Sequence, residues 1–172
     1  MNDNEKYDPE EFDIKDGVLR TYYGNSEEVT IPYGVTKIGQ EAFYNNETIK
    51  KVNFPDTVTE IDDYAFFECE NLVEVNNSKN VEKIYDSAFM FCFKLEKIDV
   101  DNVIEVKACG LLDCKNLKKL RFSKNIKKIG DNAFYGCENL NISIPETCKY
   151  VDSGEDYSFE GCKSVVIREV KN

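Results

Sequence analysis

Apolar residues recur along this chain with a period of about 23 residues, far longer than the period of a helix or a strand. The clearest marker is an alanine followed by a phenylalanine. Its aromatic or leucine position occurs six times, with steps of 23, 23, 22, 23 and 25 residues: Phe43, Phe66, Phe89, Leu111, Phe134 and Phe159. An apolar-x-x-apolar unit precedes each copy and another follows it. One copy cannot bury its apolar side alone, so the pattern predicts a solenoid of about six stacked turns.

The unit after each alanine–phenylalanine pair ends in residues that alternate between apolar and polar, as in 49–54, 72–77, 95–100 and 117–122. This period of two is typical of a short strand, and stacked turns would align these strands into one parallel sheet. We expect the pair itself on a short helical or 3₁₀ turn on the opposite side. The predicted fold class is therefore an α/β or mainly-β solenoid, because no helical period lasts beyond about one turn.

Residues 12–30 precede the array and contain two strand patterns around Asp16-Gly17, a dipeptide that favours a tight hairpin turn. We expect this hairpin to cap the first turn, because an uncovered end would expose apolar side chains and strand edges. The array then spans 31–167, between an acidic flexible tail at 1–11 and a short tail at 168–172. The fourth copy is irregular at Gly110-Leu111, and the sixth carries an insertion around 153–156.

The marker positions also carry a family resemblance. They are Ile31-Pro32, Val35, Ile38-Gly39, Ala42-Phe43 and Asn46 in the first copy, and Phe122, Ile126, Ile129-Gly130, Ala133-Phe134 and Cys137 in the fifth. Over roughly residues 12–167 the unit resembles the leucine-rich repeat of the BspA-like (treponema-type) family. This resemblance implies a right-handed superhelix of 22–25-residue turns behind an N-terminal β-hairpin. It also implies a bacterial repeat protein that binds through its sheet face.

One repeat position is held by five cysteines, and by asparagine in the first copy: Asn46, Cys69, Cys92, Cys114, Cys137 and Cys162. In a stack they would form a file, one per turn, and we expect a structural ladder of buried groups that bond weakly to backbone. A disulfide between neighbouring turns is the alternative, although five thiols cannot all pair. No metal-binding spacing or nucleotide motif occurs, so we expect no metal and no cofactor. Cys109 lies outside the file and is the strongest candidate for an exposed thiol, although a buried Cys109 fits the sequence equally well.

The outward positions of the predicted strands are candidates for partner binding: Lys51, Asn53, Glu74, Asn76, Lys97, Asp99, Lys119 and Arg121. Strands of adjacent turns lie about 4.8 Å apart, so opposite charges on them become lateral neighbours. Such a face either keeps the chain soluble and in register, or recognises a partner, since solenoids bind through extended faces. The absence of aromatic anchors on it weakens the case for recognition.

An alternative surface follows the phenylalanine position by one residue, as an apolar stripe: Tyr44, Phe67, Met90, Leu112 and Tyr135. These side chains either seal neighbouring turns against each other or form an exposed stripe that docks a partner or a second copy of the chain. Phe91 and Phe93 lie close to it in the sequence.

The charge and composition narrow the function. A net charge of −11 disfavours nucleic acid, because phosphate binding needs a basic face. With no histidine, a Ser-His-Asp or Cys-His site cannot form, and we expect no enzyme. No apolar run is long enough for membrane insertion. No signal peptide is visible, which indicates the cytoplasm, or the cell surface if a leader has been removed. We expect a non-catalytic module that binds protein or peptide, with a monomer favoured. The alternative is a spacer or self-associating segment of a larger bacterial cell-surface protein.

Overall fold

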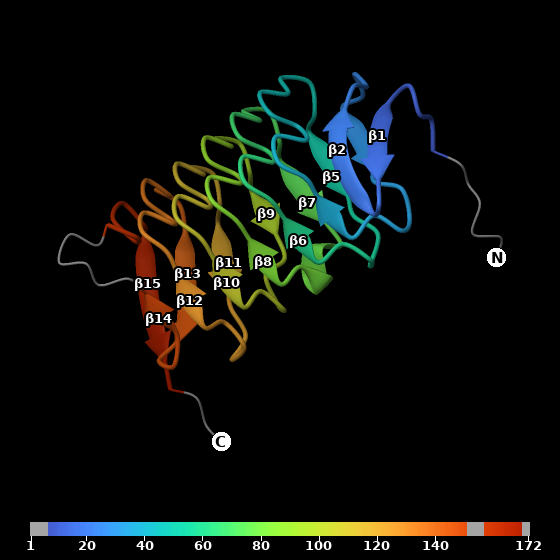
Figure 1. Ribbon diagram of the computed structural model, residues 1–172. Coiled ribbons are helices and arrows are strands. Elements are labelled where there is room, and N and C mark those ends of the chain that lie inside the picture. Colours follow the sequence, from blue (N-terminus) through green and yellow to red (C-terminus); the bar gives the residue numbers. More distant parts are fainter. Residues whose placement is uncertain (1–6, 151–156, 170–172) are drawn as a thin grey trace.

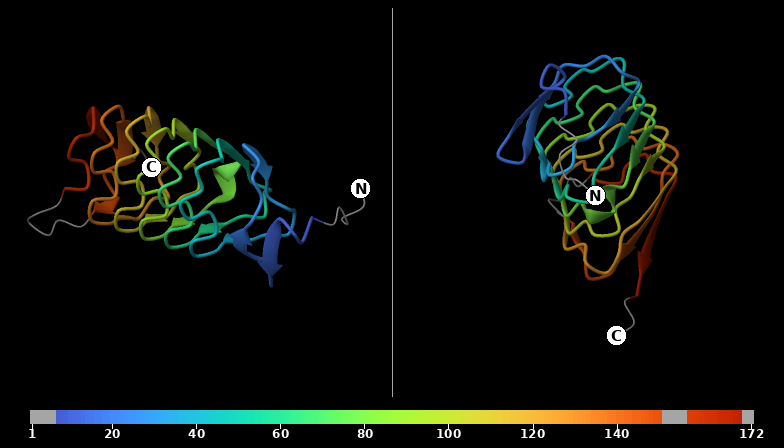
Figure 2. Two further views of the ribbon diagram at one scale, coloured as in Figure 1. Left: turned by 90° about the horizontal axis from the view of Figure 1, so that it is seen from above. Right: turned by 90° about the vertical axis from the view of Figure 1, so that its right-hand side faces the viewer.

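The computed structural model describes residues 7–150 and 157–169. It is a β-solenoid whose six turns stack in one row, from a hairpin at one end to strand β15 at the other (Figures 1 and 2). The predicted solenoid and its N-terminal hairpin are thereby confirmed. The tails expected at 1–11 and 168–172 lie partly outside the described residues, and the insertion at 153–156 lies wholly outside them.

The hairpin consists of β1 (Phe12–Lys15) and β2 (Val18–Tyr22), which pair antiparallel. Asp16 and Gly17 join them with φ values of 53° and 75°, the left-handed conformation that a tight hairpin turn requires. Strand β2 then pairs in parallel with β4 (Lys37–Ile38) of the first turn. The hairpin therefore extends the sheet of the array and covers one of its ends.

The apolar unit that precedes the alanine–phenylalanine pair in each turn contains a two-residue strand, and these strands continue the hairpin into an eight-stranded sheet. After β4 they are β6 (Glu60–Ile61), β8 (Lys83–Ile84), β10 (Glu105–Val106), β12 (Lys128–Ile129) and β14 (Lys149–Tyr150). All of them are parallel. The sequence did not predict this sheet, because a strand of two residues is too short to show a period.

The strands that the sequence did predict form two sheets. A four-stranded sheet contains β3 (Glu28–Thr30), β5 (Lys51–Asn53), β7 (Glu74–Asn76) and β9 (Lys97–Ile98). A three-stranded sheet contains β11 (Lys119–Arg121), β13 (Asn141–Pro145) and β15 (Ser164–Arg168). The expectation of one continuous parallel sheet is therefore wrong.

The break between these two sheets follows from a shortened loop. Val75 precedes Val81 by six residues, whereas Ile98 precedes Val103 by only five. Strand β9 consequently ends at Ile98, and the backbone turns away before it can pair with β11. Both backbone groups of Asp99 bind instead to the Ser78 hydroxyl, at 2.9 and 3.1 Å, on the 3₁₀ helix η1 (Ser78–Asn80).

The alanine–phenylalanine pairs do not lie on a helical or 3₁₀ turn, which corrects that expectation. Residues 41 and 45 flank the first pair with φ values of 58° and 52°, and left-handed residues at these positions stop a helix from continuing. Alternate N–H groups reach the next turn, as Phe43 N–H does to the Ala65 carbonyl at 2.8 Å. We call the segments 39–48, 62–71, 85–94, 107–116 and 130–139 the turn side of the solenoid.

The core is a file of stacked aromatic rings. Phe43 stacks on Phe66 with ring centroids 4.8 Å apart, and Phe66 stacks on Phe89 at 5.0 Å. Tyr22 of the hairpin contacts Phe43 at 5.1 Å, so the cap is joined to the core by the same file. Leu111 interrupts the rings in the fourth turn; the file is buried as far as Phe134, and Phe159 at its end is half-buried.

Candidate functional site

The five repeat cysteines lie in one file, four on the turn side and Cys162 in the last turn, and each thiol donates a hydrogen bond to a backbone carbonyl of the preceding turn. The donor–acceptor pairs are Cys69–Phe43, Cys92–Phe66, Cys114–Phe89, Cys137–Leu111 and Cys162–Phe134, at 3.0 to 3.4 Å. All seven cysteines are free thiols. Asn46, expected to be buried, is half-buried, and its amide oxygen accepts from the N–H groups of Thr48 and Ile49.

Burial holds these thiols in their neutral form. It raises the pKa of Cys69 to about 12 and the pKa of Cys162 to about 11. It raises the pKa of Cys92 well above its ordinary value. Half-buried Cys109 has a raised pKa too, first from burial and then from the charges of Asp86 and Asp131. Since the thiolate is the nucleophile and the metal ligand, these groups are suited to hydrogen bonding rather than to chemistry.

The polar side chains of the four-stranded sheet bind mainly to one another. The Asn53 amide donates to Glu28 at 2.9 Å, and the Asn76 amide donates to the Asn53 oxygen at 3.0 Å. Lys51 lies 3.8 Å from Glu74, which stands opposite Lys97 in the register. Most of the predicted sheet-face residues in this half are thus already paired within the chain.

The other half of the predicted face differs, because the sheet is broken there. A hollow of about 160 Å³ opens at the break, lined by Ile98, Asp99, Val100, Asp101, Lys119, Leu120 and Arg121. The structure therefore brings Asp99 close to Lys119 and Arg121. Among the described residues no carboxylate lies within ion-pair distance of these two cations, whose neighbours on β13 are Asn141 and Ser143.

On the turn side, five rings form a continuous surface cluster, which we call the aromatic patch: Tyr44, Tyr64, Phe67, Phe91 and Phe93. Phe67 is at its centre, stacked on Tyr44 at 5.2 Å and in edge contact with Tyr64 at 5.6 Å. Phe91 touches Phe67 at 5.7 Å, and Phe93 touches Phe91 at 5.8 Å. Tyr44 is 49% exposed and Tyr64 is 38% exposed, so the rings form part of the surface.

The structure divides the apolar stripe that the sequence proposed. Tyr44 and Phe67 belong to the aromatic patch, whereas Met90 and Leu112 are half-buried between neighbouring turns. Tyr135 is exposed two turns further along the stack from Met90. Sequence reasoning missed Tyr64, which joins the patch from the residue before the alanine.

Two rings of the patch stand on unusual backbone. Tyr64 has φ 57° and Phe91 has φ 65°, in the left-handed region that few non-glycine residues adopt. Other turns hold Glu41, Ser87, Cys109 and Asn132 at the position of Tyr64, and Asn45, Glu68, Asp113 and Gly136 at the position of Phe91. An aromatic residue is a poor choice for this conformation, so the exposed ring of Tyr64 and the half-buried ring of Phe91 are candidates for functional selection.

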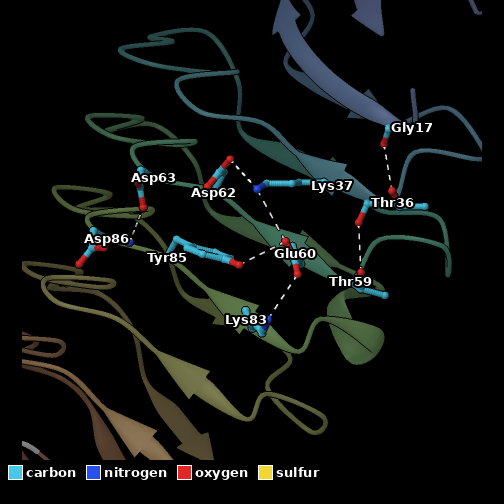
Figure 3. A network of polar contacts seen from close by, with 10 residues as sticks. All are labelled: Gly17, Thr36, Lys37, Thr59, Glu60, Asp62, Asp63, Lys83, Tyr85 and Asp86. Atoms are coloured by element: carbon cyan, nitrogen blue, oxygen red, sulfur yellow. Dashed lines mark hydrogen bonds and ion pairs between the residues drawn. The ribbon is translucent and has the colours of Figure 1, made fainter. Parts of the chain in front are cut away.

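A third surface, on the eight-stranded sheet, was not found from the sequence. Lys37, Glu60 and Lys83 are lateral neighbours on β4, β6 and β8, and Figure 3 shows the Glu60 carboxylate between the two lysines. Glu60 lies 3.7 Å from Lys37 and 3.6 Å from Lys83, and it accepts from the Tyr85 hydroxyl at 3.3 Å. The signal was the alternation of lysine and glutamate directly before the isoleucine or valine that ends the apolar unit preceding each alanine–phenylalanine pair.

Lys37 is the best-connected member of this network. Its ammonium lies 2.7 Å from Asp62 and 5.1 Å from the centre of the Tyr85 ring (Figure 3). Burial is the largest single effect and lowers the pKa of Lys37. The hydrogen bond and charge of Asp62, together with the charge of Glu60, raise this pKa by more than burial lowers it. The net pKa is above the ordinary value, so the network is internally neutralised and holds neighbouring turns together.

Residues 7–150 and 157–169 hold no metal cluster and no membrane-spanning helix. No group of three or more histidine, cysteine, aspartate or glutamate side chains in this part of the chain is placed to hold a metal ion. No helix among the described residues combines the length and the hydropathy needed to cross a membrane.

The fold and surfaces define a solenoid repeat protein with an aromatic patch at its surface. The chain belongs to the BspA type leucine-rich repeat region family, whose model matches residues 20–141 and 101–171 in six copies. No curated protein matches the chain at a significant level.

Solved structures show the same fold. A leucine rich cell surface protein from Faecalibacterium prausnitzii is 26% identical, with a TM-score of 0.75 over 92% of this chain and 52% of that one. The leucine-rich repeat protein of T. pallidum is 23% identical, with a TM-score of 0.78 over 88% of this chain and 74% of that one. A leucine-rich repeat protein from Bacteroides ovatus is 23% identical, with a TM-score of 0.66, over 87% and 47%. The chain spans about half the length of the Faecalibacterium protein.

Proposed function

We propose that this chain is a non-catalytic binding module that recognises a protein or peptide through the aromatic patch. The observation that carries the proposal is the contact of Phe67 with three other aromatic rings on the protein surface. Aromatic side chains dominate binding energy at interfaces, and they lose little conformational entropy when bound. The neutral, buried thiols support a role without catalysis.

The left-handed backbone at Tyr64 and Phe91 favours binding over a purely structural role. A ring that served only the fold would be better placed on an ordinary backbone position, because left-handed φ costs about 1–2 kcal/mol for a non-glycine residue. The likeness to a cell surface protein is consistent with a module that meets partners of other cells or of the surroundings.

The broken sheet face is a second candidate surface for the same function. Lys119 and Arg121 are exposed and lack a carboxylate partner among the described residues, and they border the hollow next to Asp99. The paired side chains on the four-stranded sheet, such as Asn53 with Asn76, would have to be released before they could bind. In the aromatic patch a charged group of the chain itself, the Lys115 ammonium, lies over a ring at the edge, that of Phe93, and the patch is the surface we favour.

The test is affinity capture from an extract of the organism that carries the gene, followed by mass spectrometry. A partner retained by the native chain and by Tyr33→Ser, but lost with Phe67→Ser, would support the patch, because Tyr33 is 72% exposed and lies outside it. A partner lost with Lys119→Glu and Arg121→Glu but kept with Phe67→Ser would assign the sheet face. Circular dichroism of every variant checks that the fold is kept.

Self-association or a role as a spacer is the alternative function. Light scattering of the native chain distinguishes it, since a dimer that Phe67→Ser dissolves would make the patch a contact between copies. A monomer at all accessible concentrations, together with capture that depends on Phe67, would support binding of a different protein.

A further inference from the structure

The surroundings of the aromatic patch are acidic. In the first two turns of the array, the turn side carries six carboxylates and no lysine or arginine: Glu41, Glu47, Asp62, Asp63, Glu68 and Glu70. The turn side of the third turn, which carries Phe91 and Phe93, adds Asp86 and Lys94, so the three turns together are acidic. Among the described residues, Glu47, Glu68 and Glu70 have no cation within ion-pair distance. Their negative charge is therefore available to a partner.

The repeat places these carboxylates beside the rings. The Glu68 N–H donates to the Met90 carbonyl at 3.0 Å, which aligns residue 68 with Phe91 of the next turn. The Phe91 N–H in turn donates to the Leu112 carbonyl at 3.0 Å, which aligns it with Asp113. Phe91 thus stands between two acidic residues, and Glu41 holds the same place beside Tyr64.

Aromatic faces and carboxylates attract the same chemical group. A guanidinium or ammonium group is drawn to the negative face of a ring, and Arg also forms paired hydrogen bonds with a carboxylate. The chain itself uses this contact at the edge of the patch, where the Lys115 ammonium lies 5.7 Å from the centre of the Phe93 ring. Apolar side chains of a partner would cover the remaining ring surface.

We infer that the aromatic patch binds a cationic segment of another protein, extended and rich in arginine or lysine, with apolar residues between the charges. This inference rests on the proposed function and adds the chemistry of the partner. The charge of the patch, and the absence of basic side chains from the turn side of the first two turns, single out this occupant over an acidic or purely apolar one.

The test measures fluorescence anisotropy with two short labelled peptides, one of alternating arginine and leucine and one of alternating glutamate and leucine. The native chain should bind the arginine peptide and not the glutamate peptide. Phe67→Ser and the pair Glu68→Gln with Glu70→Gln should each weaken binding about tenfold or more. The matched control is Asp56→Asn with Asp131→Asn, which removes the same charge from exposed sites outside the patch and should change binding less than about twofold.

The outcomes separate the two proposals. If the control pair weakens binding as much as the patch pair, the attraction is general charge and the inference is wrong. If the glutamate peptide binds instead and Phe67→Ser abolishes this, the patch is a binding surface but its partner is not cationic. If no patch variant changes the binding of either peptide, both the inference and the patch as the binding surface fall.

Discussion

The Cys69 thiol donates a hydrogen bond to the backbone carbonyl of Phe43, 3.0 Å away in the preceding turn. The same carbonyl also accepts the N–H of Asn46 at 3.0 Å within its own turn. Equivalent pairs recur through the stack, so each file cysteine attaches its turn to the one before it. The thiols therefore contribute to the contact between turns, and a carbonyl that loses its thiol keeps a backbone partner.

Replacing one of these thiols should change the response of stability to alkaline pH. The folded-state pKa of Cys92 is raised well above its ordinary value of 9.0, so below pH 9 the thiol is protonated in both states. Above pH 9 the unfolded chain releases this proton and the folded chain keeps it, which lowers stability by up to about 1.4 kcal/mol per pH unit. Cys92→Ala lacks this loss. The difference in unfolding free energy between the native chain and Cys92→Ala, present at pH 7, should therefore shrink as the pH rises from 9 to 11. Urea denaturation at each pH measures this difference.

The control for this prediction is Cys109→Ala, because the Cys109 thiol is only half-buried. The stability difference between this variant and the native chain should change less between pH 9 and pH 11. A deficit for Cys92→Ala that stays constant from pH 7 to pH 11 would mean that the Cys92 thiol titrates normally. In that case the thiol is not sealed in the core as the structure places it.

Phe89→Ala should lower the free energy of unfolding by about 3–5 kcal/mol. The ring is fully buried and stacks on Phe66 at 5.0 Å, so its removal leaves a cavity between two turns. Chemical denaturation measures the loss, and Tyr33→Ala provides a surface control that should change stability by less than about 0.5 kcal/mol. A loss below about 1 kcal/mol for Phe89→Ala would contradict the repeat register.

The repeat register, the number of turns and the hairpin were predictable from the sequence, because each turn repeats the same inward residues. The break of the sheet was not predicted, although its signal was present as a step of 22 residues between Phe89 and Leu111. A step of 22 residues shows that one loop of the turn is a residue shorter, but it does not show which loop. Whether the strands still pair depends on which backbone groups find other partners, as the backbone of Asp99 does at the Ser78 hydroxyl.

Asp62→Asn should lower the pKa of Lys37 toward or below its ordinary value. The hydrogen bond and charge of Asp62 help to raise this pKa, whereas burial, which lowers it, remains after the substitution. The interaction stabilises the fold below the ordinary pKa of 10.5, and it is lost as the pH rises through the higher folded-state pKa. An NMR titration of the lysine side chains measures the change. An unaltered Lys37 titration would show that the 2.7 Å contact with Asp62 is not held in solution.

Phe91→Asn should separate stability from binding. Asparagine tolerates the left-handed backbone at position 91 better than phenylalanine, and this relief offsets the lost ring contacts with Phe67 and Phe93. We expect the free energy of unfolding to stay within about 1 kcal/mol of the native value, while affinity for the arginine–leucine peptide falls. A loss of 3 kcal/mol or more would make Phe91 a core residue.

The candidate site was less predictable than the fold, for a physical reason. Tyr44 and Phe67 follow the repeat position and were found from it, whereas Tyr64 and Phe91 contact Phe67 from positions with left-handed backbone. A left-handed backbone is normally predicted from a glycine or asparagine in the sequence, and here aromatic residues occupy positions 64 and 91. The charge ladder around Glu60 was hidden in strands of two residues.

Hydrogen–deuterium exchange of the chain, with and without a saturating amount of the arginine–leucine peptide, shows where the peptide binds. We expect added protection within 41–48, 62–71 and 85–94, the segments that carry the aromatic patch. We expect unchanged exchange in the strands from β5 to β11. Protection confined to those strands, or bound peptide without protection on the turn side, would contradict the assignment of the aromatic patch as the binding surface.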